Sequence, residues 1–365
     1  MTFKGKSFLM SLVAALLLGI IFPNISISTA DAAWTDHFKF KGDFRYRYEM
    51  ADKEGSDERV RHRIRARLAV SAKVSDSVSV KLRLATGSDD PVSTNQSLDG
   101  YFSTKGFHLD RAYVQWKATD VFTAKLGKMG NPFYKPMKSE LVWDGDLCPE
   151  GIAAQFETTG DFKVYGNFAY LVIDERKSDT DDAYLFGGQL GFKIPMGSAK
   201  LNIGGGYYGY INQEGYDVFG GDFGNSTDDM GMYTMDFTNF EAFAELKAKL
   251  GSLPFGIYGH YVVNTEADSN DTGYQFGFSL GKVKKPMSWA LKYSYKELEA
   301  DAVVGAFTDS DFIGGGTDGK GHEIGFGLGL GKHSSLGVSY FLNEIGLEGS
   351  SRDYDRLMID FKFKF

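Results

Sequence analysis

The sequence predicts an all-β protein, a transmembrane antiparallel up-and-down β-barrel of about 16 strands. Three observations predict this fold. Glycine and aromatic residues are abundant, with 45 Gly, 30 Phe and 20 Tyr against 8 Pro, which is typical of many short strands joined by turns. Apolar and polar residues alternate with a period of two. Long and short connections also alternate, as they do when hairpins cross a membrane with short turns on one side.

The N-terminal residues are expected to be a secretory signal peptide. Two lysines precede an apolar run from Phe8 to Phe22, and Ala30-Asp31-Ala32 supplies small residues for cleavage. A membrane-anchoring helix is the alternative, but the run is short for one. The expected organisation is therefore a signal peptide, residues 1–32, followed by a single barrel domain, residues 33–365.

Composition excludes several classes of function. Without the signal peptide the chain has 38 basic and 47 acidic residues, so it is a poor candidate for binding nucleic acid. Cys148 is the single cysteine, which excludes an internal disulfide framework and a multi-cysteine metal site. The six histidines are scattered, and HExxH does not occur. No catalytic residue, metal or cofactor is therefore expected.

Sixteen strands are expected in the following order. They cover roughly residues 37–50, 58–74, 77–87, 107–118, 121–129, 150–159, 161–173, 183–195, 198–211, 236–250, 253–265, 271–283, 287–299, 320–331, 334–345 and 354–365. Long loops such as 88–106 alternate with tight turns such as Gly160-Asp161. An even number of strands places both termini on the side of the short turns, which is periplasmic in the outer membrane of a Gram-negative bacterium.

The segment RVRHRIRARLAV, residues 59–70, shows the two faces of a strand most clearly. Its five arginines all stand at odd positions, whereas Val60, Ile64 and Leu68 stand at even ones. One arginine facing lipid at mid-bilayer costs ~2–4 kcal/mol, so five would cost on the order of 10 kcal/mol or more, comparable to the whole stability of a protein. The arginines must face a wet interior, where sixteen strands leave an aqueous channel.

A basic ladder is thus predicted to line the inside of five successive strands. Its members are Arg45, Arg47, Arg59, Arg61, Arg63, Arg65, Arg67, Lys81, Arg83, Arg111, Lys117 and Lys125. Their clustering on one wall favours a preference for anions. The alternative is structural: the arginines pair with Asp43, Glu49 and Asp110 and stabilise the wall. The two roles can coexist.

The loop 130–149, GNPFYKPMKSELVWDGDLCP, is expected to fold inward and narrow the channel. Its acids are Glu140, Asp144 and Asp146, with Glu150 at its end. Opposite the arginines, they would create a transverse field that orients dipolar solutes and filters ions. An exposed loop with solvated acids is the alternative. The acidic segments 226–229 and 309–311 are expected to be solvated loop tips, with binding of divalent cations at the cell surface as the alternative.

Several segments carry a resemblance to a known family: RVRHRIRARL, LRLATGSDDPVSTNQSL, LDRAYVQW, AKLGKMGNPFYKP and LVWDGDLCPEGIAAQFE. Through them, roughly a third of the chain resembles the putative porin family of Gram-negative outer membranes, and more distantly the phosphate-selective porins. The C-terminal half matches in architecture only. The final MIDFKFKF, with Phe361, Phe363 and Phe365, looks like the terminal strand signal read by the outer-membrane assembly machinery.

The resemblance implies a porin. Such a protein forms a water-filled channel for passive diffusion of small hydrophilic solutes and ions, has no enzymatic activity, and contacts outer-membrane lipid and lipopolysaccharide. Analogy with general porins of sixteen strands implies a homotrimer. Two alternatives stay open. One is a non-conducting barrel that sheathes a secreted partner. The other is a barrel phospholipase, for which His62 on the lipid face shows no serine partner.

Overall fold

A computed structural model describes residues 37–178 and 181–365 of the chain. The chain divides into two units, residues 1–39 and 40–365, and the fold is that of the second unit. The predicted signal peptide, residues 1–32, lies outside the described residues. Within the described ranges, no helix is long and apolar enough to cross a membrane.

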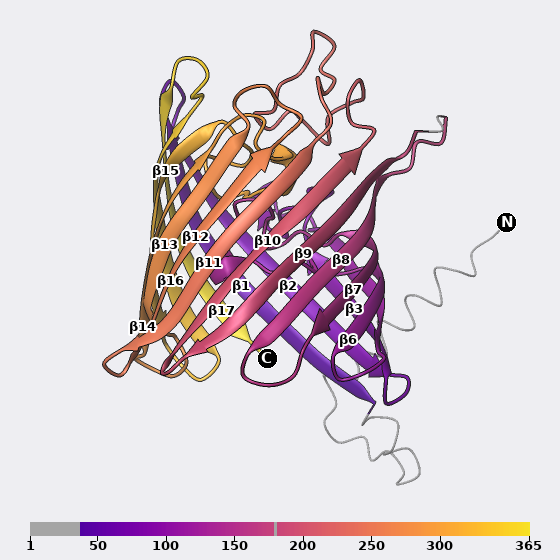
Figure 1. Ribbon diagram of the computed structural model, residues 1–365. Helices are drawn as coiled ribbons and strands as arrows, with labels where there is room; N and C mark the ends of the chain where they lie inside the picture. Colours follow the sequence, from indigo (N-terminus) through magenta and orange to yellow (C-terminus); the bar gives the residue numbers. More distant parts are fainter. Residues whose placement is uncertain (1–36, 179–180) are drawn as a thin grey trace, which may run out of the picture. The chain divides into compact units, whose positions relative to one another are not determined.

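One antiparallel sheet of seventeen strands makes up the fold (Figure 1). Because β4 has only two residues, sixteen long strands remain, and the predicted number is confirmed. The strands are β1 (Phe38–Lys53), β2 (Arg59–Lys73), β3 (Val78–Thr86), β4 (Gln96–Ser97), β5 (Phe107–Lys117), β6 (Phe122–Lys128), β7 (Glu150–Glu157), β8 (Lys163–Asp174), β9 (Ala183–Met196), β10 (Ala199–Ile211), β11 (Thr238–Leu250), β12 (Leu253–Asn264), β13 (Thr272–Gly281), β14 (Trp289–Leu298), β15 (Gly319–Gly329), β16 (Ser334–Ile345) and β17 (Arg352–Lys364). Two single-turn 3-10 helices, η1 (Pro136–Lys138) and η2 (Gly305–Phe307), lie in loops.

The sheet closes into a barrel where β1 pairs with β17, from Asp43 opposite Lys364 to Lys53 opposite Tyr354. Closure leaves the long strands without an unpaired edge. Local irregularities around β3 were not predicted from the sequence. The short strand β4 pairs with β2 beyond the end of β3, and the register of β5 against β3 shifts at Asp110.

Long and short connections lie at opposite ends of the barrel. In Figure 1 the long loops emerge at the top, and the short turns and the C-terminus lie toward the bottom. The turn between β11 and β12, for example, has only Gly251 and Ser252, whereas the connection between β10 and β11 runs from residue 212 to 237. The alternation predicted from the sequence is therefore confirmed, and it gives the barrel one end built of loops.

The outer face of the barrel is apolar and the inner face is largely polar. Leu126, Phe186 and Phe276 are each about half exposed, at 57%, 48% and 48%. By contrast, Gln189 and Asn239, at inward-facing positions, are 1% and 0% exposed. This division is what a barrel requires when its outer surface meets lipid and its interior holds water and polar side chains.

An apolar core inside the barrel was not predicted from the sequence. Three loops, which connect β6 to β7, β10 to β11 and β14 to β15, pack against inward side chains of β7 to β10, β12 and β14. The core includes Met129, Phe133, Leu141, Val142, Trp143, Leu147, Tyr208, Tyr210, Tyr233, Phe237, Val303, Val304, Phe312 and Ile313. The expectation that residues 309–311 form a solvated tip is wrong, because Asp309 is 9% exposed. Asp228 and Asp229 are exposed, as expected.

Candidate functional site

The arginines of β2 lie beside acidic residues of β1, the neighbouring strand. Arg63 Nη1 lies 3.3 Å from Glu49 Oε2, and Arg61 contacts the same carboxylate. Arg65 Nη2 and Arg67 Nε lie 3.0 and 2.9 Å from the two oxygens of Asp43. Because alternate residues of a strand share one face, the odd positions of β1 and β2 meet in successive ion pairs on the inner face.

The last strand extends this ion-pair network across the seam of the barrel. Arg47 on β1 lies opposite Asp360 on β17, and its Nε donates to Asp360 Oδ1 at 2.7 Å. Arg356 Nη2 lies 3.0 Å from Glu49 Oε2. Glu49 is 0% exposed, so three guanidiniums surround one fully buried carboxylate. We call the inward arginines of β1, β2 and β17, together with these acids, the arginine wall.

The remaining predicted members of the ladder are distributed more widely. Arg83 pairs with Asp110, the residue at the register shift of β5. All three acids predicted as partners, Asp43, Glu49 and Asp110, therefore bind arginines, as the structural alternative expected. Arg83 and Arg111 also contact Cys148 Sγ, at 3.4 and 3.2 Å.

The lysines of the ladder differ in their positions. Lys81 donates to Gln115 Oε1 at 2.7 Å on the inner face, and Lys125 lies on the next strand, opposite Gln115. Lys117 is a correction to the predicted ladder. It ends β5 at a short turn, is about half exposed, and pairs with Asp120 at 2.9 Å. Arg59, the first residue of β2, is also exposed and lies near the loop end.

The loop 129–149 is anchored to inward side chains of β9, β11, β12 and β13. Tyr134 exchanges two hydrogen bonds with Gln189 on β9, its N–H donating at 2.7 Å and its carbonyl accepting at 2.9 Å. Its hydroxyl donates to Glu245 on β11 at 2.9 Å. Ser139 reaches β12 and β13, where its Oγ lies 2.9 Å from His260 Nδ1. These contacts draw the loop across the barrel.

Ser139, His260 and Glu241 form a hydrogen-bonded series that was missed from the sequence. His260 Nε2 lies 2.9 Å from Glu241 Oε2, so the residue types match those of a hydrolase triad. Ser139, however, is 3% exposed, and its Oγ also contacts Gln275 Oε1 at 2.6 Å and accepts from the Leu141 N–H at 3.3 Å. A serine enclosed in this way cannot meet a substrate, and the series serves as an anchor for the loop.

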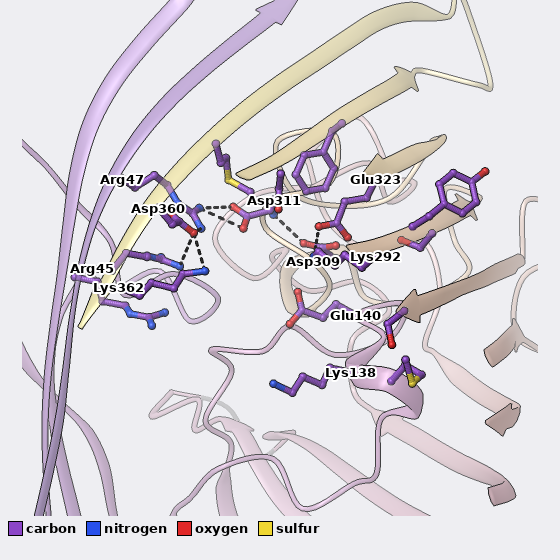
Figure 2. A pocket seen from close by; sticks show the side chains of 18 of the residues that line it. Arg45, Arg47, Lys138, Glu140, Lys292, Asp309, Asp311, Glu323, Asp360 and Lys362 are labelled. Atoms are coloured by element: carbon purple, nitrogen blue, oxygen red, sulfur yellow. Dashed lines mark hydrogen bonds and ion pairs between the residues drawn. The ribbon is translucent and has the colours of Figure 1, made fainter. Parts of the chain in front are cut away.

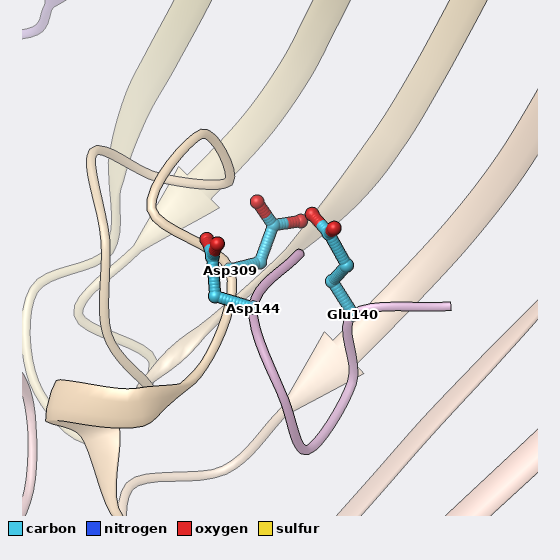
Figure 3. A group of neighbouring side chains, drawn as sticks. All are labelled: Glu140, Asp144 and Asp309. Carbon is cyan, nitrogen blue, oxygen red and sulfur yellow. The ribbon is translucent and has the colours of Figure 1, made fainter. Parts of the chain in front are cut away.

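Two of the predicted loop acids meet a third acid from a loop near the end of the chain. Glu140, Asp144 and Asp309 have carboxylate oxygens within 4.8 Å of one another (Figure 3). Burial and the nearby Asp309 carboxylate raise the pKa of Asp144 to about 7, and burial raises the pKa of Glu140 well above its ordinary value. Carboxylates are the ligands that Ca²⁺ and Mg²⁺ prefer, but protons held here compete with a cation.

Asp146 and Glu150, the other predicted acids, lie elsewhere. Asp146 Oδ1 lies 3.1 Å from Arg67 Nη1 and 3.7 Å from Arg65 Nη1. Although burial opposes its charge, these two guanidiniums lower the pKa of Asp146. Glu150 is a correction to the predicted group. It begins β7, is exposed, and pairs with Lys128 at 2.8 Å, so it takes no part in the loop inside the barrel.

The arginine wall and the loops enclose two cavities. The lining of the inner cavity, of about 650 Å³, includes Arg65 and Arg67. Figure 2 shows Arg45 and Arg47 on one side of it and Lys292 and Glu323 on the other. The outer cavity, of about 360 Å³, lies toward the long loops and is lined by Arg59, Arg61, Arg63 and Arg356. Asp309 and Asp311 line the inner cavity, whereas Ser310 between them lines the outer one. The loop 299–318 therefore separates the two cavities.

Asp311 joins this loop to the arginine wall. Its Oδ1 lies 3.1 Å from Arg47 Nη1 and 3.1 Å from Arg356 Nη2. Burial opposes its charge, yet the two guanidiniums lower the pKa of Asp311 well below its ordinary range. No pattern in the sequence indicated this contact, because the loop has no periodicity and its partners are about 45 and 260 residues away.

The C-terminal phenylalanines lie on the outer face. Phe361, Phe363 and Phe365 are 41%, 45% and 74% exposed, and Phe363 packs near Phe44 with ring centroids 6.4 Å apart. Their position on the closing strand is compatible with an assembly signal, which stays a prediction. His62 also lies on the outer face, where its Nδ1 is 2.7 Å from the Tyr46 hydroxyl.

Comparisons with known proteins match both the sequence and the fold. The profile of a family described as "Putative porin" matches residues 51–241 and 232–365. The fold is similar to the high-pH structure of OprB from Pseudomonas putida, with a TM-score of 0.62, 10% identity, and coverage of 92% of this chain and 96% of that chain. No curated protein matches the sequence.

Two further solved structures share the fold. OmpF of Salmonella typhi in complex with daunomycin gives a TM-score of 0.55 at 9% identity, with 90% of this chain and 97% of that chain covered. OmpT of Vibrio cholerae, described as a trimer form, gives 0.54 at 13% identity, with coverage of 90% and 100%. At these identities the similarity shows the fold alone.

Proposed function

Because this chain belongs to the family described as "Putative porin", we propose that it forms a water-filled channel in the outer membrane of a Gram-negative bacterium, for passive diffusion of small hydrophilic solutes and ions. The observation that carries the proposal is a charged inner wall in a closed sixteen-stranded barrel with an apolar outer face. A barrel of this strand number leaves an aqueous interior.

The constriction is the second part of the proposal. The loop 129–149 crosses the interior and is held by Gln189, Glu245 and His260. Apolar side chains of the same loop pack into the interior core, which fills part of the barrel with protein. The space that remains runs beside the arginine wall, so permeating solutes would pass within contact distance of guanidiniums.

A weak preference for anions follows from the charges around the inner cavity. Eight basic and six acidic side chains line it, and Glu140, one of the six, has a raised pKa that favours its neutral form. The excess of positive charge is small because the arginines are paired with acids. We therefore expect selectivity well below that of a channel lined by unpaired arginines.

Planar-bilayer recording of the purified, folded protein tests the channel. We expect discrete conductance steps in KCl, and a reversal potential in a salt gradient whose sign reports net passage of chloride. Protein that is folded by heat-dependent gel migration but gives no steps would contradict the proposal. It would favour the second candidate, a non-conducting barrel, which the partition between the two cavities also permits.

Catalysis is not part of the proposed function. In the described residues, the one Ser-His-acid series identified above is enclosed and holds the constriction loop. The proposed partners are outer-membrane lipid and lipopolysaccharide, the assembly machinery and two further copies of the chain. The description of one structure with this fold as a trimer form supports the last proposal, and native mass spectrometry in detergent tests it.

A further inference from the structure

Two buried guanidiniums hold the carboxylate of Asp311. Arg47 and Arg356 are 3% and 2% exposed. Arg47 Nη1 donates to the two oxygens of Asp311 at 3.1 and 3.3 Å, and Arg356 Nη2 lies 3.1 Å from Oδ1. Arg356 Nη1 also donates to the backbone carbonyl of Asp311 at 2.9 Å. A carboxylate between two arginines is thus bound in the manner of a small anionic ligand.

The wall carries more guanidiniums than its own strands can neutralise. Around Asp311 the strands supply the five arginines Arg45, Arg47, Arg61, Arg63 and Arg356, but only the carboxylates of Glu49 and Asp360. The Nε–H groups of Arg45 and Arg356 are buried and have no acceptor within the described structure. The wall therefore has the charge and the donors for an additional carboxylate, and the loop brings one to it.

Asp311 belongs to a loop and lies at the boundary between the two cavities. Its side chain is 29% exposed, whereas the carboxylate of Glu49 is fully buried. Arg47 lines the inner cavity and Arg356 the outer one, so Asp311 binds the wall between them. A solute that moves along the arginine wall from one cavity to the other would pass the position that this carboxylate occupies.

We propose that Arg47 and Arg356 form a binding site for the carboxylate group of permeating solutes, and that Asp311 is a tethered competitor that occupies this site when no solute is present. The inference rests on the proposed channel function. Displacement of the Asp311 side chain vacates the space beside the two guanidiniums, so entry of a small carboxylate and opening of the passage between the cavities are one event. Solutes without an anionic group do not displace this side chain.

The tether explains why competition matters. A carboxylate attached to the same chain as its site has an effective concentration on the order of millimolar or higher at that site. A free carboxylate must compete with it. Its apparent affinity for the site is the intrinsic affinity multiplied by the fraction of time that Asp311 leaves the site vacant. Removal of the Asp311 charge should therefore raise the apparent affinity for a free carboxylate by roughly tenfold.

Succinate titration against channel current tests the inference. In planar bilayers with KCl, we expect the succinate concentration that halves chloride current to fall by roughly tenfold in Asp311→Asn relative to wild type. Asp318→Asn is the matched control. It removes one charge from the same loop, and its carboxylate accepts from backbone N–H groups, that of Glu348 at 3.2 Å and that of Leu347. Its half-blocking concentration should equal that of wild type.

Two outcomes overturn the proposal: folded Asp311→Asn protein with unchanged succinate sensitivity, or an equal change in Asp311→Asn and Asp318→Asn. Asp311→Ser, which also lacks the carboxylate, replaces Asp311→Asn if the latter does not fold. Calorimetric titration of succinate into detergent-solubilised protein tests the carboxylate site separately from the channel function. If the wild-type barrel carries no current, the channel proposal fails, and tighter succinate binding by Asp311→Asn still decides the inference.

Discussion

The carboxylate of Glu49 on β1 lies 3.0 Å from Nη2 of Arg356 on β17, and so joins the first strand of the barrel to the last. Arg61 and Arg63 bind the same carboxylate from β2. Glu49 is 0% exposed, and removing one member of a buried group of charges leaves the others uncompensated.

Glu49→Gln should therefore lower the free energy of unfolding by about 3–5 kcal/mol. The measurement is a urea titration of the folded barrel in phospholipid vesicles, followed by tryptophan fluorescence. Asp120→Asn, which breaks the exposed pair with Lys117 at a short turn, is the control and should leave the unfolding curve unchanged. Equal effects of the two substitutions would mean that the seam is not held by these charges.

The acid cluster predicts how stability changes with pH. The pKa of Asp144 is raised from 3.8 to about 7, first by burial and then by Asp309, so the folded protein holds a proton that the unfolded chain releases. This contribution is fully present below about pH 4 and is lost as pH rises toward 7, and it is on the order of a few kcal/mol.

Asp144→Asn should flatten the dependence of the unfolding midpoint on pH between about 4 and 7. Asp146 and Asp311 have lowered pKa values, so their contributions have the opposite sign and are lost only in acid, below this window. A wild-type midpoint that rises with pH across the window, or a variant that retains the full wild-type slope, would contradict this assignment.

The anchor of the constriction loop can be removed with one substitution. Ser139→Ala deletes the hydroxyl between His260 and Gln275 and leaves both partners buried without it, which should cost about 1–3 kcal/mol. A looser loop should also increase single-channel noise. Ser334→Ala, in β16 at a short turn, is the control. If the anchor is instead a hydrolase centre, wild-type protein will release fatty acid from phospholipid and Ser139→Ala will not.

Charge change in the ladder tests the proposed ion preference. Reversal of the charge at Arg63 and Arg65, for example Arg63→Glu with Arg65→Glu, should shift the reversal potential in a KCl gradient toward the value for cations. Arg65→Gln alone removes one positive charge, so it should produce a smaller shift of the reversal potential in the same direction. Lys73→Gln, at an exposed strand end, should produce none. An unchanged potential in all three would remove the ladder from the conducting path.

Periodicity explains what could be predicted from the sequence. The alternation of side chains along a strand predicts that the arginines from Arg61 to Arg67 share one inner face. The same rule predicts Asp43 and Glu49 as their partners. The alternation of long loops with short turns predicts the closed barrel. These predictions need only local patterns. The pairing of neighbouring strands then places the residues that each pattern identifies side by side in the barrel.

Contacts made by irregular segments could not be predicted in this way. The acidic segment 309–311 predicts a solvated loop tip, whereas Asp311 binds Arg47 and Arg356. Ser139 and His260 were not paired, because they are 121 residues apart and one lies in a loop. Glu150 was grouped by its distance along the chain, but it lies in β7. Without a repeating pattern, only the folded chain shows which loop residue meets which strand.

The position of Asp311 has a consequence for biogenesis. It binds Arg47 on the first strand and Arg356 on the last, and it reaches them from a loop that enters the interior between β14 and β15. These contacts of Asp311 therefore form late, after nearly the whole chain has been delivered to the membrane, because they join distant parts of the sequence. Pairing of β1 with β17 and packing of the loop 299–318 inside the barrel should then occur as a single cooperative step. In a nascent barrel that lacks its final hairpin, neither the strand pairing nor the loop packing should be complete.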